Sequence, residues 1–156
     1  MTWQMPIVLL VALISPLRIA AQAIAKGDTG MNKVRVRYMV SDLDPAVKFY
    51  TTYLGFRMAR ESKPNFAMLD RGNLELVLST PFGPGGAARP MSDGRKSEPG
   101  GWNRIILNVN DIQGEVARLK AARLHFRNDI VSGPGGSETL LDDPSGNPIE
   151  LFQAAR

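Results

Sequence analysis

The chain has 156 residues, a formal net charge of +4 and a hydrophobic content of 44%, which is enough apolar material for one ordinary globular core. The basic residues are scattered and mostly alternate with apolar ones, so the charge argues against a nucleic-acid-binding protein. Because there is no cysteine, the sequence excludes disulfides, thiolate nucleophiles and zinc–thiolate sites.

The first segment, residues 1–23, has the pattern of a secretory signal peptide. An apolar run is followed by small residues, with Ala21 and Ala23 in the A-x-A spacing of a cleavage site. We expect a periplasmic or secreted protein without a membrane anchor, because the run is shorter than the ~20 apolar residues that span a bilayer. The alternative is a misplaced start, with Met31 beginning a cytoplasmic protein. Residues 24–33 are interpreted as an N-terminal linker.

Residues 34–79 are predicted to form a first βαβββ module. The sequence VRVRYMV from Val34 alternates apolar and polar residues, which predicts a strand with one apolar face. Apolar residues then recur at helical spacing over residues 42–56, with Asp44 as the predicted N-cap and Pro45 at the first helical position. Three short strands are expected at 56–61, 65–69 and 74–79.

A Gly/Pro-rich linker, residues 80–101, separates this module from a second one at residues 102–153. Here Ile112, Val116 and Leu119 repeat the spacing of the apolar residues in the first predicted helix, so we interpret the chain as two copies of one unit. The strands and the helix of the second copy are expected at 104–109, 111–124 (helix), 125–130, 137–141 and 148–152.

The predicted fold class is therefore α+β, with paired βαβββ modules. Each copy places its helix on one face of a sheet and leaves the other face uncovered. Two uncovered faces that curl toward one another form a partly open barrel around a central cleft, which is where a small ligand is expected to bind.

Two stretches, VSDLDPAVKFYTTYLGF in the first module and GPGGSETLLDDPSGNPIELFQ in the second, resemble the vicinal oxygen chelate superfamily of glyoxalases, bleomycin resistance proteins and dioxygenases. The resemblance extends from Val34 to Phe152. It implies the paired-module fold and a homodimer. It leaves the chemistry open, because members of this superfamily include isomerases, dioxygenases, thiol transferases and metal-free binding proteins.

In the metal-dependent members of this superfamily, a histidine on the first strand and a glutamate on the last strand of each module bind one divalent ion. The resemblance places Arg35, Glu75, Arg104 and Glu150 at these four positions. A protonated guanidinium has no free lone pair and repels cations. We therefore expect no metal and no other cofactor.

Strand alternation predicts that these four side chains face the cleft, since leucines and isoleucines flank both glutamates on the opposite face. Two Arg–Glu ion pairs are then expected in place of the metal ion. One hypothesis is that they bind a polar or anionic ligand. The alternative is a structural network that only fills the former metal cavity.

Further ligand-binding candidates follow from their predicted positions. Arg37 shares the inward face of the first strand, and Asn108 and Phe152 face inward in the second module. Trp102 either stacks an aromatic ligand at the mouth of the cleft or lies in the core, and of these we favour the core. The single histidine, His125, is interpreted as structural.

The leading functional hypothesis is a metal-independent protein of the bleomycin-resistance type that holds a small polar or aromatic compound between its modules. Whether the protein is an enzyme stays open. The alternative is a lyase, isomerase or dioxygenase-type member with an atypical metal site or metal-free acid–base chemistry, rather than a hydrolase. Glu75 and Glu150 are then the candidate catalytic residues, each acting as a general base if burial raises its pKa.

Overall fold

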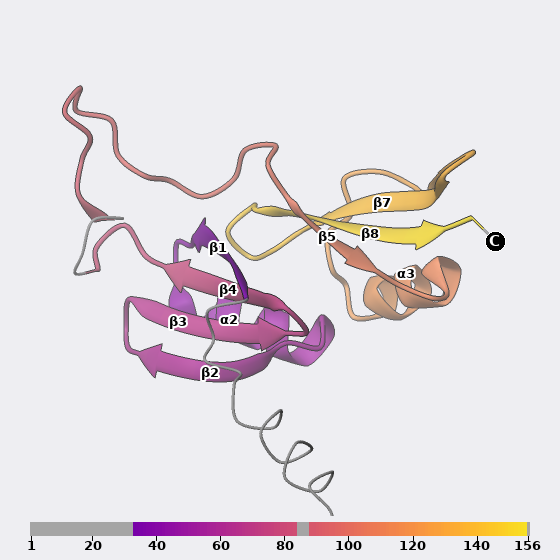
Figure 1. Cartoon of the computed structure of the whole chain (residues 1–156), viewed down its shortest axis with the longest axis horizontal. Coiled ribbons are helices and arrows are strands. Elements are labelled where there is room, and N and C mark those ends of the chain that lie inside the picture. The colour runs from indigo at the N-terminus through magenta and orange to yellow at the C-terminus, as the bar shows by residue number, and fades with distance from the viewer. Residues whose placement is uncertain (1–32, 84–87, 156) are drawn as a thin grey trace, which may run out of the picture. The chain divides into compact units, whose positions relative to one another are not determined.

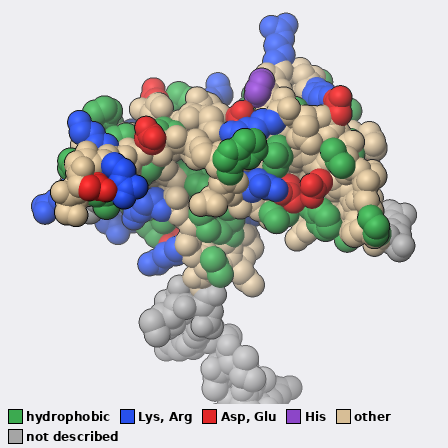
Figure 2. Space-filling view, turned by 90° about the horizontal axis from the view of Figure 1, so that it is seen from above, with side chains coloured by type: hydrophobic (Ala, Val, Ile, Leu, Met, Phe, Trp, Pro, Cys, Tyr) green, Lys and Arg blue, Asp and Glu red, His purple; other side chains and the backbone are tan. Residues whose placement is uncertain are grey.

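A computed structural model describes residues 33–83 and 88–155. The predicted signal peptide and the alternative start at Met31 lie outside these residues. Within the described residues, no helix is both long and apolar enough to cross a membrane. Basic, acidic and apolar side chains are interspersed over the face seen in Figure 2, as the scattered basic residues of the sequence predict.

The first module has the predicted βαβββ order (Figure 1). Strand β1 runs parallel to β4, and β4 and β2 both pair antiparallel with β3, which gives the sheet order β1-β4-β3-β2. The elements are β1 (Val34–Met39), α2 (Leu43–Tyr53), β2 (Arg57–Ser62), β3 (Phe66–Arg71) and β4 (Leu74–Ser79).

The second module repeats this topology with the sheet order β5-β8-β7-β6, so the predicted duplication is confirmed. No strand of one sheet pairs with a strand of the other among the described residues, so the two sheets stay unclosed. The elements are β5 (Ile105–Asn108), α3 (Ile112–Ala121), β6 (Val131–Gly133), β7 (Gly136–Asp142) and β8 (Pro148–Ala154).

Two local predictions are wrong. The N-cap of α2 is Asp42 rather than Asp44, and its carboxylate accepts a hydrogen bond from the backbone N–H of Asp44 at 3.2 Å. Pro45 therefore lies in the third helical position, where an absent N–H still costs nothing because the first turn has no intrahelical acceptor. The strand expected at 125–130 contributes only one isolated bridge, between Phe126 and Leu141, and the edge strand β6 follows it.

One apolar core occupies the helix side of both sheets, because alternate residues of each strand meet an amphipathic helix there. The predicted core positions of α3 are buried, and so are Leu43 and Tyr50 of α2. The largest fully buried apolar side chains from the strands are Leu69, Leu76, Leu78, Leu141, Ile149 and Leu151. This packing leaves the opposite face of each sheet without a helix.

Buried hydrogen bonds join the two modules at their adjoining strands. The Tyr38 hydroxyl donates to the carbonyl of Pro148 at 3.0 Å and accepts from the backbone N–H of Ile105 at 2.8 Å. The Tyr50 hydroxyl donates to the Asp143 carboxylate at 3.0 Å. We call this group, Tyr38, Tyr50, Asp143 and Asn147, the latch.

Asp143 is the centre of the latch. Its carboxylate is 4% exposed and also accepts hydrogen bonds from the backbone N–H groups of Ser145 and Asn147, at 2.8 and 2.9 Å. The Asn147 amide donates both to Asp143 at 2.8 Å and to the carbonyl of Met39 in the first module at 2.9 Å. Every polar group that the latch buries in these contacts thus has a partner, which burial requires.

Candidate functional site

The helix-free face of the first sheet carries an arginine and a glutamate side by side. The parallel register of β1 and β4 sets Arg35 opposite Glu75, and the Arg35 Nε atom forms an ion pair with Glu75 Oε1. The Glu75 side chain is 9% exposed, whereas that of Arg35 is 61% exposed. A buried carboxylate on this face is therefore covered by a guanidinium that itself reaches solvent.

The second sheet repeats the arrangement. Arg104 directly precedes β5, and its Nε donates to Glu150 Oε2 on β8 at 2.6 Å. Glu150 is 5% exposed at its side chain and Arg104 is 34% exposed. Both predicted Arg–Glu ion pairs are thus present, one in each module.

These four positions do not fit a divalent metal ion. Each glutamate is engaged by a guanidinium, which offers a metal no lone pair. No group of three or more His, Cys, Asp or Glu side chains in the described part of the chain is placed to hold an ion. The donor set that remains is two separate carboxylates, each already neutralised.

The two ion pairs are not in contact with each other. Each lies on its own sheet, and no hydrogen bond or ion pair within the described residues links Arg35 or Glu75 to Arg104 or Glu150. That all four line one cleft therefore stays a prediction, since a single copy of the chain does not bring them together.

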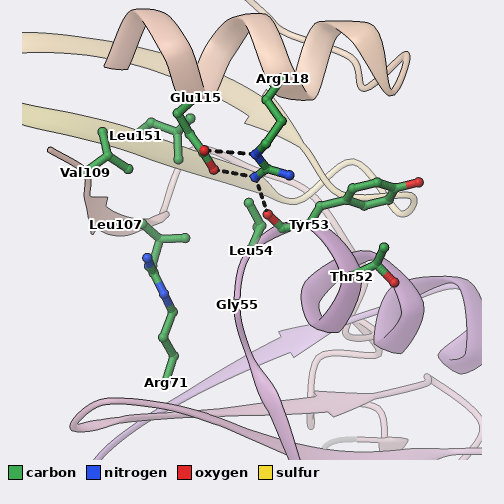
Figure 3. A pocket seen from close by; sticks show the side chains of 10 residues that line it. All are labelled: Thr52, Tyr53, Leu54, Gly55, Arg71, Leu107, Val109, Glu115, Arg118 and Leu151. Carbon is green, nitrogen blue, oxygen red and sulfur yellow. Dashed lines mark hydrogen bonds and ion pairs between the residues drawn. The ribbon is translucent and has the colours of Figure 1, made fainter. Parts of the chain in front are cut away.

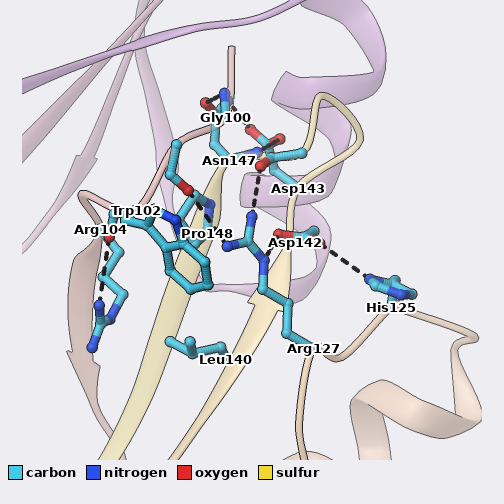
Figure 4. A network of polar contacts seen from close by, with 12 residues as sticks. Gly100, Trp102, Arg104, His125, Arg127, Leu140, Asp142, Asp143, Asn147 and Pro148 are labelled. Carbon is cyan, nitrogen blue, oxygen red and sulfur yellow. Dashed lines mark hydrogen bonds and ion pairs between the residues drawn. The ribbon is translucent and has the colours of Figure 1, made fainter.

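Trp102 is 75% exposed, so the favoured core position was wrong. The residue precedes β5 and follows Gly100 and Gly101, which both adopt the positive φ angles that favour glycine. The guanidinium of Arg127 lies over the indole ring, 5.4 Å from its centroid. Arg104 approaches the backbone carbonyl of Trp102 at 3.5 Å, so two arginines flank the tryptophan (Figure 4).

Sequence reasoning left Arg127 unassigned, although it belongs to this surface. Its Nε donates to Asp142 at 2.7 Å, and Asp142 also contacts Nδ1 of His125 at 3.1 Å (Figure 4). No periodic signal marked this position, because residues 125–130 form no regular strand. We call the surface formed by Trp102, Arg104 and Arg127 the tryptophan surface.

The other candidates, Arg37, Asn108 and Phe152, do not line one common pocket. Arg37 donates to the Ser79 hydroxyl at 2.5 Å on the first sheet. Asn108 and Phe152 are register partners in β5 and β8. However, Asn108 lines a pocket of about 430 Å³ at the end of that sheet, whereas Phe152 lines another of about 220 Å³ beside β6.

Comparisons with known proteins identify relatives of the chain. The model of the Glyoxalase/Bleomycin resistance protein/Dioxygenase superfamily matches residues 33–151. No curated protein sequence matches the chain.

Solved structures of the same fold include a member of this superfamily from Sphaerobacter thermophilus, with 26% identity and a TM-score of 0.62, which covers 78% of this chain and 95% of that one. TnmS3, an antibiotic-binding protein from Streptomyces, shows 22% identity and a TM-score of 0.61 over 79% of this chain and 95% of that one. Lactoylglutathione lyase from Agrobacterium tumefaciens shows 19% identity and a TM-score of 0.61 over 77% of this chain and 91% of that one.

Proposed function

The chain belongs to the Glyoxalase/Bleomycin resistance protein/Dioxygenase superfamily, and from that premise we propose that it is a metal-independent protein that binds a small anionic aromatic compound. The observation that carries the proposal is the replacement of both expected histidines by arginine, with each arginine in an ion pair with its glutamate. A guanidinium has no nitrogen lone pair with which to bind a metal, and its positive charge neutralises the glutamate that a cation would otherwise pair with.

The tryptophan surface suggests the chemical class of the ligand. An exposed indole offers a flat apolar face on which an aromatic ring stacks. Arg104 and Arg127 on either side carry fixed positive charge, and a guanidinium pairs readily with a carboxylate, sulfonate or phenolate. TnmS3, which shares the fold, is an antibiotic-binding protein, and an antibiotic-sized aromatic compound is in keeping with this surface.

A homodimer is part of the proposal. Both sheets leave one face without a helix, and the second module exposes Ile106, at 55%, on that face, where it pairs in register with Glu150. A partner that covers this side chain removes apolar area from water, which favours association. Two copies also supply the closed cleft that one chain does not form by itself. Analytical ultracentrifugation of the full chain tests this point, and a monomer at micromolar concentration contradicts it.

The first experiment measures metal content and thermal stability with and without Ni²⁺, Zn²⁺, Mn²⁺ and Fe²⁺. We expect no bound metal and no increase in melting temperature, since specific binding to the folded state stabilises it by RT ln(1 + [L]/Kd). A stoichiometric metal contradicts the proposal. The variant Arg35→His with Arg104→His serves as the positive control, because it restores the four-ligand pattern of the metal-dependent relatives and is expected to gain affinity for these ions.

The second experiment measures binding of 1-anilinonaphthalene-8-sulfonate, an anionic aromatic probe, by its fluorescence. We expect Trp102→Ala to weaken binding about tenfold, which corresponds to 1.4 kcal/mol. Phe82→Ala is a matched control, because Phe82 is a similarly exposed aromatic residue, at 83%, that does not belong to the tryptophan surface. Equal losses in both variants contradict a specific role for Trp102.

A lyase or isomerase is the second candidate, and one observation favours it. Glu75 is 7% exposed, and its Oε1 atom, although ion-paired, has no aligned hydrogen bond among the described residues. A buried carboxylate with spare accepting capacity is suited to proton abstraction. Glu75→Gln distinguishes the two functions. If the protein is an enzyme, this variant loses turnover and still binds its substrate. If it is a binding protein, neither the native chain nor the variant turns over a substrate.

A further inference from the structure

A pocket of about 330 Å³ lies on the helix side of the molecule, away from the open sheet faces (Figure 3). Its walls come from both modules: the end of α2 and the turn that follows it, the end of β3, and parts of β5, α3 and β8. The lining mixes apolar with charged groups. The apolar side chains are Leu54, Leu107, Val109 and Leu151, and the charged ones are Arg71, Glu115 and Arg118.

Arg71 points into this pocket toward Leu107 (Figure 3). It is the last residue of β3 and lies two positions after the fully buried Leu69, so its side chain leaves the strand on the helix side. The guanidinium lies 6.0 Å from the centroid of the Phe56 ring, and among the described residues it has no hydrogen bond or ion pair. Loss of hydration on burial lowers the pKa of Arg71, and the charge of Glu115 only partly opposes this effect.

The neighbouring charged groups, Glu115 and Arg118, form an ion pair with each other and not with Arg71. Arg118 donates from Nε to Glu115 Oε2 at 3.0 Å and from an NH2 group to Glu115 Oε1 at 2.5 Å. The same guanidinium donates to the carbonyl of Tyr53 at the end of α2, at 2.7 Å. Two guanidinium groups and one carboxylate leave the pocket with a net charge of +1 (2 − 1).

We propose that this pocket binds a small monocarboxylate with an apolar body, whose carboxylate pairs with Arg71 while the body packs against Leu107, Val109 and Leu151. The five donors of a guanidinium match a carboxylate in bidentate geometry. The net charge of +1 favours a single negative charge, since Glu115 repels a second one. The volume suits an acid with one ring or a short branched chain.

The test uses benzoate as the probe and the full chain labelled with ¹⁵N. Titration is expected to shift the amide signals of Gly55, Arg71 and Val109, and Arg71→Gln is expected to weaken benzoate binding at least tenfold. Benzyl alcohol, a neutral molecule of the same shape, is expected to bind at least tenfold more weakly than benzoate. Arg57→Gln, which removes an exposed arginine of β2 outside this pocket, is expected to leave the affinity unchanged.

A second variant strengthens binding instead of weakening it. Glu115→Gln raises the net charge of the lining from +1 to +2 and is expected to increase the benzoate affinity severalfold. Because Arg71 has no ion-pair partner among residues 33–83 and 88–155, Arg71→Gln is expected to keep the melting temperature of the native chain, so lost binding in that variant reports the site and not unfolding.

The affinity is read from the amide signals of Gly55 and Val109, because benzoate also belongs to the ligand class proposed for the tryptophan surface. The proposal is overturned if these signals give equal affinities for Arg71→Gln and the native chain, or if benzyl alcohol shifts them as effectively as benzoate. It is also overturned if benzoate shifts the signals of Trp102 and Arg104 but not those of Gly55, Arg71 and Val109. The two sites share no residue, so the signals of each report its own proposal.

Discussion

The ion pair between Arg104 and Glu150 shows, at the scale of single residues, how burial determines the effect of an ion pair on stability. The Glu150 side chain is 5% exposed and accepts a 2.6 Å hydrogen bond from Arg104, which is 34% exposed. A carboxylate buried to this extent lowers the free energy of unfolding if its partner is removed. An intact pair, in contrast, gives about the same free energy of unfolding as apolar side chains of the same size. The pair is thus a requirement of the fold more than a source of its stability.

Arg104→Ala is therefore expected to lower the free energy of unfolding by about 2 kcal/mol, less than for a fully buried pair because Arg104 reaches solvent. Urea denaturation measures the loss. Arg104→Met combined with Glu150→Leu is expected to recover most of it, because no charge is then left unpaired. Arg95→Ala, which removes an ion pair with both partners exposed, is the control and is expected to change nothing measurable. An unchanged value for Arg104→Ala contradicts the buried pair.

Each βαβββ module is built from a helix with a defined start. Asp42 and Asp111 cap α2 and α3, and both precede an apolar residue that begins the buried stripe of the helix. The Asp111 carboxylate accepts from the backbone N–H of Gly114 at 3.0 Å, three residues along the helix, whereas that of Asp42 accepts from Asp44. The duplicated element thus keeps the same capping residue type but not the same hydrogen bond.

The assigned N-cap predicts which of the two aspartates in DLDPAVKF, Asp42 or Asp44, contributes more to stability. Asp42→Ala is expected to lower the free energy of unfolding by about 1 kcal/mol, the usual cost of a lost N-cap. Asp44→Ala is expected to have a much smaller effect, because Asp44 is inside the helix and the ion pair of its side chain with Lys63 is exposed. Thermal denaturation of the two variants measures this. The reverse order of effects contradicts the assigned N-cap.

At the scale of the whole molecule, the latch joins the modules. Each module has its own sheet, and no strand pairing links the two sheets among the described residues. The latch instead connects them through side chains, with Tyr38 and Tyr50 from the first module and Asp143 and Asn147 from the second. We therefore expect side-chain contacts between the modules to make the two modules unfold together.

Asp143→Ala removes the acceptor of four hydrogen bonds and is expected to cost about 3 kcal/mol. We also expect the urea transition to broaden, because the two modules lose their coupling. Circular dichroism and tryptophan fluorescence followed together measure both effects. Asp129→Ala, at an exposed position, is the control. A sharp, unshifted transition for Asp143→Ala contradicts the latch.

The latch also makes stability depend on alkaline pH. Burial raises the pKa of Tyr38 from 10.0 to about 12, and burial together with Asp143 raises the pKa of Tyr50 well above its usual value. The folded state holds both protons more tightly than the unfolded chain, so their contribution to stability is complete below pH 10, and that of Tyr38 is lost as the pH rises through about 12. The melting temperature is therefore expected to fall from pH 10 upward. Tyr38→Phe is expected to reduce this slope, and an equal slope contradicts the assignment.

The amino-acid sequence by itself determined the two βαβββ modules and the amphipathic stripes of their helices, because these features depend on local periodicity, which the sequence pattern encodes directly. The two Arg–Glu pairs were implied by the resemblance to the superfamily. Strand alternation was sufficient to set Glu75 and Glu150 on the faces opposite the core.

Tertiary structure alone decided the exposed position of Trp102, the latch around Asp143, and the pocket that contains Arg71. Each of these joins residues from separate elements or from both modules. Their contacts depend on the directions of irregular turns and on how one module packs against the other. Sequence periodicity predicts neither the turn directions nor this packing. The separation of the two ion pairs has the same origin, because a single chain leaves its two sheets unclosed.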